Sequence, residues 1–76
     1  MKPGEVVRHR KQTTYYLGGG HYIVVRPAAL DRRWMVDERT AFGGYRILHS
    51  LPTRAEADFV AEMYVAARGL YMAGAA

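Results

Sequence analysis

The sequence predicts an α+β fold, in which an antiparallel sheet of three to four strands, connected as a meander, is followed by one C-terminal helix packed on one face. Two observations support this fold class. Apolar residues recur with a period of 2 up to residue 50, and with a period of 3.6 from residue 53 onwards. Glycine and proline separate the alternating runs at intervals that suit short hairpin connections.

Length and composition limit the choices further. The chain of 76 residues is expected to form a single domain, residues 1–76, and since it contains no cysteine, packing or self-association must stabilise it. No stretch approaches the ~18 apolar residues of a membrane span, and the first residues lack the apolar run of a secretory signal. We therefore expect a cytoplasmic protein that does not contact a membrane.

The N-terminal part alternates in polarity over residues 5–17, where Val7 and Tyr15 fall on one side and Arg8 falls on the other. We predict a fourth strand here. Residues 1–12 are accordingly interpreted as a basic N-terminal arm or as an edge strand of the sheet.

The antiparallel sheet is expected within residues 13–50. Three runs rich in β-branched and aromatic residues predict its other strands, at 21–26, 34–40 and 45–50. The glycine pair Gly43-Gly44 predicts a short hairpin between the last two runs. The apolar side chains expected to face the helix are Ile23, Val25, Trp34 and Ile47.

The helix is predicted over residues 53–68. Thr53 and Glu56 have the spacing of a capping box. An apolar stripe on one side consists of Ala55, Phe59, Val60, Met63, Ala66 and Ala67, and the opposite side carries Arg54, Asp58, Glu62 and Arg68. We expect Phe59 and Met63 to anchor the helix on the sheet. Gly69 is expected to end the helix in a left-handed conformation, which leaves residues 70–76 as a tail.

Catalytic and cofactor chemistry is not indicated by the sequence. Gly18-Gly19-Gly20 leads into a predicted strand rather than into a helix, so it is read as a turn and not as a phosphate-binding loop. His9, His21 and His49 lie in different predicted strands, which disfavours a metal site. Ser50 is the sole serine, and its neighbour His49 projects to the opposite face. We expect no enzymatic activity, no cofactor and no metal.

Charge and aromatic residues point instead to binding. Residues 1–33 hold seven Lys or Arg against two Asp or Glu, net +5, whereas residues 34–76 are net −1. Nine of the eleven cations are arginine, which suits planar contacts with phosphate, carboxylate or aromatic rings, although high genomic GC content gives the same bias. At least two of the six tyrosines are expected to be exposed beside the glycine turn; the alternative is that all six fill the edges of a small sheet. The candidate binding residues are Arg8, Arg10, Lys11, Tyr15, Tyr16, Tyr22, Arg26, Arg32 and Arg33.

In its small size, its lack of catalytic groups and its sheet-plus-helix design, the chain resembles small phage-encoded or mobile-element inhibitors of the anti-CRISPR type. The resemblance is one of architecture and composition, and no family motif carries it. It implies a stoichiometric, non-enzymatic binding protein in the host-cell cytoplasm. Its partner would be a host protein or nucleoprotein complex, and it would act by sterically occluding a nucleic-acid-binding effector.

A three-stranded sheet backed by a C-terminal helix is also similar to DNA-binding domains of the AP2 and integrase amino-terminal type. That similarity implies direct binding of DNA or RNA, with exposed tyrosines stacking on unpaired bases and the candidate cations neutralising phosphates. The net charge of +4 is modest for such a role, and Asp37 and Glu38 fall in the middle of the sheet. A homodimer that completes the core, as in an antitoxin-like or structural subunit, is a third alternative.

Overall fold

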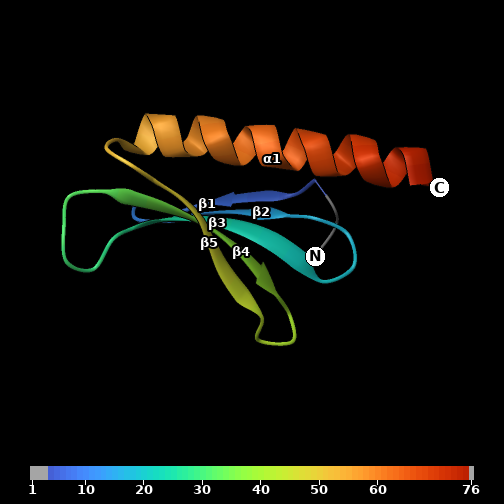
Figure 1. The fold of residues 1–76 in the computed structure, drawn as a ribbon, viewed down its shortest axis with the longest axis horizontal. Coiled ribbons are helices and arrows are strands. Elements are labelled where there is room, and N and C mark those ends of the chain that lie inside the picture. Colours follow the sequence, from blue (N-terminus) through green and yellow to red (C-terminus); the bar gives the residue numbers. More distant parts are fainter. Residues whose placement is uncertain (1–3, 76) are drawn as a thin grey trace.

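The computed structural model describes residues 4–75, with side chains up to Arg68, as a five-stranded antiparallel sheet beneath one long helix (Figure 1). The elements are β1 Val6–Arg8, β2 Thr13–Tyr16, β3 His21–Pro27, β4 Trp34–Thr40, β5 Tyr45–Leu51 and α1 Arg54–Ala75. Each strand pairs with its neighbour in sequence, so the spatial order is β1-β2-β3-β4-β5. The predicted α+β class, the meander and the single C-terminal helix are confirmed, whereas the predicted number of strands, three to four, is too low.

The additional strand arises because residues 5–17 form two strands rather than one. The polar run from His9 to Gln12 folds back on itself, and the His9 N–H donates to the Gln12 carbonyl at 2.6 Å. β1 and β2 then pair antiparallel, with Arg8 opposite Thr13. Directly paired residues share one face of a sheet, so Arg8 lies on the same face as Tyr15, contrary to the predicted alternation.

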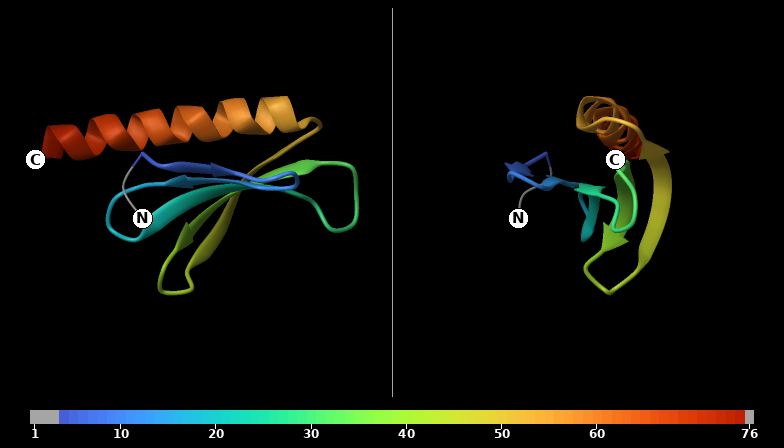
Figure 2. Two further views of the ribbon diagram at one scale, coloured as in Figure 1. Left: turned by 180° about the vertical axis from the view of Figure 1, so that it is seen from behind. Right: turned by 90° about the vertical axis from the view of Figure 1, so that its left-hand side faces the viewer.

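The hydrophobic core lies between the sheet and α1. Viewed along the helix, the sheet curves around it, with β1 and β5 on either side (Figure 2). The buried apolar residues of the core are Tyr15, Ile23, Val25 and Val36 of the sheet and Ala57 and Ala61 of the helix. Ile23, Val25 and Trp34 face the helix as predicted.

The helix presents a different face to the sheet from the one predicted. Ala57 and Ala61 are fully buried, while Phe59 and Met63 are 62% and 59% exposed, so the predicted anchors point away from the sheet. The alanines allow the helix to approach the sheet closely. Arg54, one of the residues assigned to the solvent side, makes polar contacts with the sheet. Val60 of the predicted stripe does pack against the core, but the centre of the buried stripe lies at Ala57 and Ala61 and not at Phe59 and Met63.

The two ends of the helix also differ in how well they were predicted. The Glu56 N–H donates to Thr53 Oγ1 at 3.2 Å, so Thr53 caps the helix as expected. The predicted termination at Gly69 is wrong, because α1 continues through Gly69 to Ala75. Residues 70–75 of the predicted tail are thus helical, and residue 76 lies outside the described part.

An irregularity in the β4–β5 hairpin changes which residues of β5 face the helix. Val36 pairs with His49, but Asp37 pairs with Ile47, so Leu48 is an extra residue that forms a β-bulge. Beyond the bulge the faces of β5 exchange. Ile47, predicted to face the helix, therefore lies on the opposite side of the sheet and is 49% exposed.

Candidate functional site

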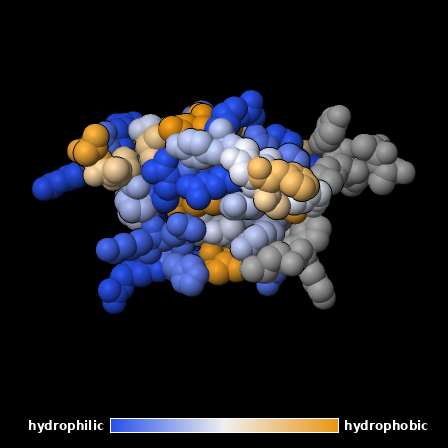
Figure 3. All heavy atoms as spheres, turned by 90° about the horizontal axis from the view of Figure 1, so that it is seen from below, coloured by the Kyte–Doolittle hydropathy of each residue, from blue (hydrophilic) through white to orange (hydrophobic). Residues whose placement is uncertain are grey.

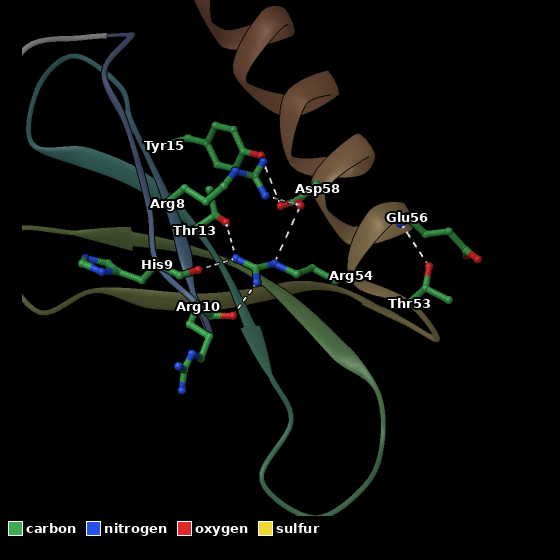
Figure 4. Close-up of polar contacts among 9 residues, drawn as sticks. All are labelled: Arg8, His9, Arg10, Thr13, Tyr15, Thr53, Arg54, Glu56 and Asp58. Carbon is green, nitrogen blue, oxygen red and sulfur yellow. Dashed lines mark hydrogen bonds and ion pairs between the residues drawn. The ribbon is translucent and has the colours of Figure 1, made fainter.

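Six of the nine arginines are held in pairs by three carboxylates, and the first of these clusters joins α1 to the N-terminal hairpin. Asp58 accepts from Arg8 Nη1 at 3.1 Å and lies 3.9 Å from Arg54 Nε (Figure 4). The hydrogen bond to Asp58 raises the pKa of Arg8 above its ordinary value. Tyr15 OH donates to the same carboxylate at 3.3 Å. Burial, together with the negative charge of Asp58, raises the pKa of Tyr15 to about 12.

Arg54 extends this cluster to the backbone of the β1–β2 turn. Its Nη1 donates to the Arg10 carbonyl at 2.5 Å, and its Nη2 donates to the His9 carbonyl at 2.6 Å and to Thr13 Oγ1 at 3.0 Å (Figure 4). The guanidinium also lies over the Trp34 ring, 5.3 Å from its centroid. Arg54 is therefore a structural link between the start of the helix and the first hairpin.

The second cluster, around Glu38, fastens the middle of the helix. Arg46 Nη2 donates to Glu38 Oε1 at 2.8 Å, and Arg68 of α1 donates to the other carboxylate oxygen. His49 and Tyr64 approach within 3.2 Å on the same side of the sheet. Like the Asp58 cluster, this one connects strands to the helix.

The third cluster, around Asp37, lies on the face of the sheet that α1 leaves uncovered. Arg26 Nε donates to Asp37 Oδ2 at 2.6 Å, and Arg39 Nη2 donates to the same oxygen at 3.1 Å. The hydrogen bond to Asp37 raises the pKa of Arg26 above its ordinary value. Arg26 Nη2 reaches Tyr45 OH at 3.4 Å, and the Arg39 guanidinium lies 5.6 Å from the Tyr45 ring centroid.

Aromatic and arginine side chains form a continuous row across this uncovered face. Tyr16 is paired with Tyr22, Tyr22 with Arg39, and Arg39 with Tyr45, so four strands contribute one side chain each. The Tyr16 and Tyr22 rings lie 5.9 Å apart. We call "the open face" the surface formed by this row together with Arg26, Met35 and Ile47. Figure 3 shows the molecule from the side opposite α1, where hydrophilic residues predominate and apolar ones form separate small patches.

A glycine turn borders one end of the open face. Gly19 and Gly20 have φ values of 72° and 78°, which only glycine adopts readily, and β3 follows them directly. The Ala41 N–H donates to the Gly20 carbonyl at 2.8 Å, so this turn is joined to the β4–β5 turn. A shallow concavity of about 300 Å³ lies here, with Tyr16 and Tyr22 in its lining. The glycines therefore support a hairpin and aromatic side chains rather than the start of a helix.

The structure divides the predicted binding residues among three places. Arg8 and Tyr15 lie on the helix face, and Tyr15 is buried in the core. Tyr16, Tyr22 and Arg26 lie on the open face. The remaining four, in the β1–β2 and β3–β4 connections at one end of the sheet, are Arg10, Lys11, Arg32 and Arg33. The predicted set therefore does not form one surface.

Arg39 and Tyr45, which complete the row across the open face, are not among the binding residues predicted from the sequence. The sequence nevertheless contains an indication that these two residues belong to the row. Once the hairpin lengths are fixed, counting back from each turn places Tyr22, Arg39 and Tyr45 opposite one another on three neighbouring strands.

The fold and this surface define a class, a small α+β protein with one sheet face covered by a helix and the other lined by tyrosine and arginine. No protein-family model, curated protein or solved structure matches the chain. Within residues 4–75, no group of three or more His, Cys, Asp or Glu is placed to hold a metal ion. The single helix, as far as it is described, lacks the apolar stretch needed to cross a bilayer.

Proposed function

We propose that the protein is a non-enzymatic binding protein that acts stoichiometrically and docks on a protein partner through the open face. The observation that carries the proposal is the cross-strand row of Tyr16, Tyr22, Arg39 and Tyr45 on a sheet face that no described element covers. Tyrosine and arginine are enriched among the residues that dominate binding energy at protein interfaces. A row of them on paired strands provides a contact surface rather than a reaction site.

The rigidity of the open face supports the same function. Its side chains stand on hydrogen-bonded strands, and the buried carboxylate of Asp37 holds both Arg26 and Arg39. A surface that is already ordered loses less conformational entropy on association, which favours affinity.

For the biological role, we propose an inhibitor of the phage or mobile-element type, similar in design to anti-CRISPR proteins. A compact chain with a positively charged, tyrosine-rich face can cover the part of an effector complex that contacts nucleic acid. Inhibition would then be steric and would require one copy of the protein for each site.

The proposed docking surface can be tested by capture and identification of partners. Tagged wild-type protein and a Tyr16→Ala, Tyr22→Ala variant are used as baits in the native host lysate, and bound proteins are identified by mass spectrometry. We expect the double variant to lose a partner that the wild type captures. Phe59→Ala is the matched control, because it removes an aromatic side chain that is 62% exposed on the other side of the molecule. Equal capture by the wild type and the double variant would contradict the proposal.

Direct nucleic-acid binding is a second candidate, favoured by one specific observation. Arg10, Lys11 and Arg32 lie in two connections at the same end of the sheet, and their side chains make no ion pair with residues 4–75. Three phosphate contacts predict that the logarithm of affinity falls with the logarithm of salt concentration with a slope of about −3. Gel shifts with a duplex and with a single strand, between 50 and 200 mM salt (about the range over which such contacts weaken measurably), test this. The absence of a salt-sensitive complex would remove this candidate.

A further inference from the structure

The Asp37 cluster differs from the other two arginine clusters in what it connects. The clusters around Asp58 and Glu38 both join the helix to strands, so they contribute to the packing of the two layers. Asp37 instead joins β3 to β4, which seven residue pairs already hold together. The packing of the helix on the sheet therefore does not require the Asp37 cluster.

The Asp37 cluster is also costly for the isolated chain. The side chain of Asp37 is fully buried, although it lies on the face of the sheet that no described element covers. Burying an ion pair costs several kcal/mol in desolvation, and well-packed apolar residues at such positions are often as stable or more stable. Both arginines converge on Oδ2, while Asp37 Oδ1 and Arg39 Nε are buried and have no hydrogen-bond partner among the described residues. The cluster is thus incompletely satisfied by the described residues.

The arginines retain donors that reach solvent. Arg26 uses Nε and Nη2, and Arg39 uses Nη2, in contacts with the described residues. The Nη1 groups of both make no such contact and are not among the buried unpaired atoms. Two arginines around one carboxylate leave one net positive charge. The pair is therefore suited to an anionic group with two oxygens, which can accept one charge-assisted hydrogen bond from the Nη1 group of each arginine.

We propose that Arg26 and Arg39 form a receptor for a glutamate or aspartate side chain of an acidic segment on the partner protein. This inference rests on the proposed function, since it names the chemistry that the open face recognises. Tyr45, Met35 and Ile47 surround the arginines, so the acidic residue of the partner is expected to be flanked by apolar residues.

A protein carboxylate fits the charge of the open face better than a nucleic acid does. A phosphate backbone requires several cations along its path. The described cations that make no ion pair with the described residues lie in connections at one end of the sheet; they are Arg10, Lys11, Arg32 and Arg33. A single net charge among aromatic and apolar side chains instead matches one carboxylate.

The inference is tested by nuclear magnetic resonance on the full chain labelled with ¹⁵N. The probe is the peptide acetyl-Ile-Glu-Tyr-Glu-Ile-amide, and the matched peptide has Gln in place of both Glu residues. We expect the Glu peptide to shift the Nε–Hε resonances of Arg26 and Arg39 in a saturable manner, and to bind at least about tenfold more tightly than the Gln peptide. Equal binding of the two peptides would overturn the inference.

Two variants with the same change in charge locate the effect. Arg39→Gln is expected to weaken binding of the Glu peptide by about tenfold or more. Arg46→Gln removes an arginine from the helix face, where the side chain is 67% exposed, and should leave binding unchanged. If Arg39→Gln does not fold, as judged from its amide spectrum, Arg39→Lys is measured against the same criterion, because the lysine ammonium lacks the rigid, planar arrangement of donors that lets a guanidinium hold Asp37 through one nitrogen and present another to the ligand. Equal weakening by the Arg39 and Arg46 variants would count against the site.

Further outcomes distinguish a carboxylate from other ligands, and a failure of this inference from a failure of the proposed function. Tighter binding of inorganic phosphate or of an oligothymidine at the same two resonances would replace the carboxylate with a phosphate ligand and overturn the inference. In the capture experiment, a partner lost by the Tyr16→Ala, Tyr22→Ala variant but retained by Arg39→Gln would refute the receptor and leave the open face as the docking surface. A partner retained by both variants would refute the proposed function itself.

Discussion

At the scale of single residues, Tyr15 shows how a buried hydroxyl couples the sheet to the helix. Its ring belongs to the core at 3% exposure, and its hydroxyl donates to Asp58 of α1. Burial and the neighbouring negative charge both disfavour the tyrosinate, so the pKa of Tyr15 rises to about 12.

This pKa predicts a loss of stability at alkaline pH. An unfolded tyrosine ionises near pH ~10, whereas folded Tyr15 retains its proton until about pH 12. The contribution of Tyr15 is therefore fully present below pH ~10 and declines as the pH rises from ~10 through 12, because only the unfolded state releases the proton there. Urea unfolding of the wild type and of Tyr15→Phe across this range measures it. We expect the wild type to lose stability more steeply, and parallel curves would show that Tyr15 ionises normally.

The partners of the charged residues could not be predicted from the sequence. Arg8 and Asp58 are 50 residues apart, and Arg68 and Glu38 are 30 apart, so no local spacing indicates either pair. Periodicity assigned Asp58 and Arg68 to the solvent side because polar residues usually lie there. An ion pair that bridges two layers reverses that assignment, and only the three-dimensional packing reveals it.

At the scale of elements, strands and turns were predictable where the local chemistry is specific. The runs at 34–40 and 45–50 correspond closely to β4 and β5, and the glycines at 18–20 and 43–44 fall in turns. The polar turn between β1 and β2 was missed because it contains neither glycine nor proline. The bulge at Leu48 was missed because an extra residue leaves no mark in an apolar pattern.

Replacement of glycine by alanine is expected to have opposite effects on stability at Gly69 in the helix and at Gly20 in the β2–β3 turn. α1 continues through Gly69, where a helical glycine costs conformational entropy, so Gly69→Ala should raise the free energy of unfolding by about 0.5–1 kcal/mol and increase helicity. Gly20 has a φ of 78°, where Gly20→Ala should lower the free energy of unfolding by about 1 kcal/mol. Circular dichroism and thermal unfolding measure both. A destabilising Gly69→Ala would show that the helix ends there in a left-handed conformation.

At the scale of the whole molecule, the two faces of the sheet differ in the residues they carry. The helix face holds the core and the clusters around Asp58 and Glu38, which together secure the helix. The open face carries the tyrosine–arginine row and one cluster that no layer requires. The sequence predicted that tyrosine and arginine side chains form the binding surface. It could not show which of them stabilise the fold instead, because this depends on the face of the sheet that each residue occupies.

Arg54 should determine whether the molecule unfolds as one unit. It bonds to two carbonyls of the β1–β2 turn from the first residue of α1, so it ties the edge hairpin to the rest of the chain. We expect Arg54→Gln to lower the free energy of unfolding by about 2 kcal/mol and to speed hydrogen exchange in β1 and β2 most. Arg32→Gln, which alters an exposed residue, is the control and should change stability by less than about 0.5 kcal/mol. Uniform acceleration across all strands would show that the hairpin is not separately held.

The bulge at Leu48 has a consequence for how the protein behaves at high concentration. β5 is an edge strand of seven residues that exposes Tyr45 and Ile47, and such an edge is a template for further strands. The extra residue interrupts the regular spacing of its outward amide and carbonyl groups, so a second β5 cannot pair with it along its full length. We therefore expect the irregularity that turns Ile47 onto the open face also to hinder fibrillar aggregation through β5.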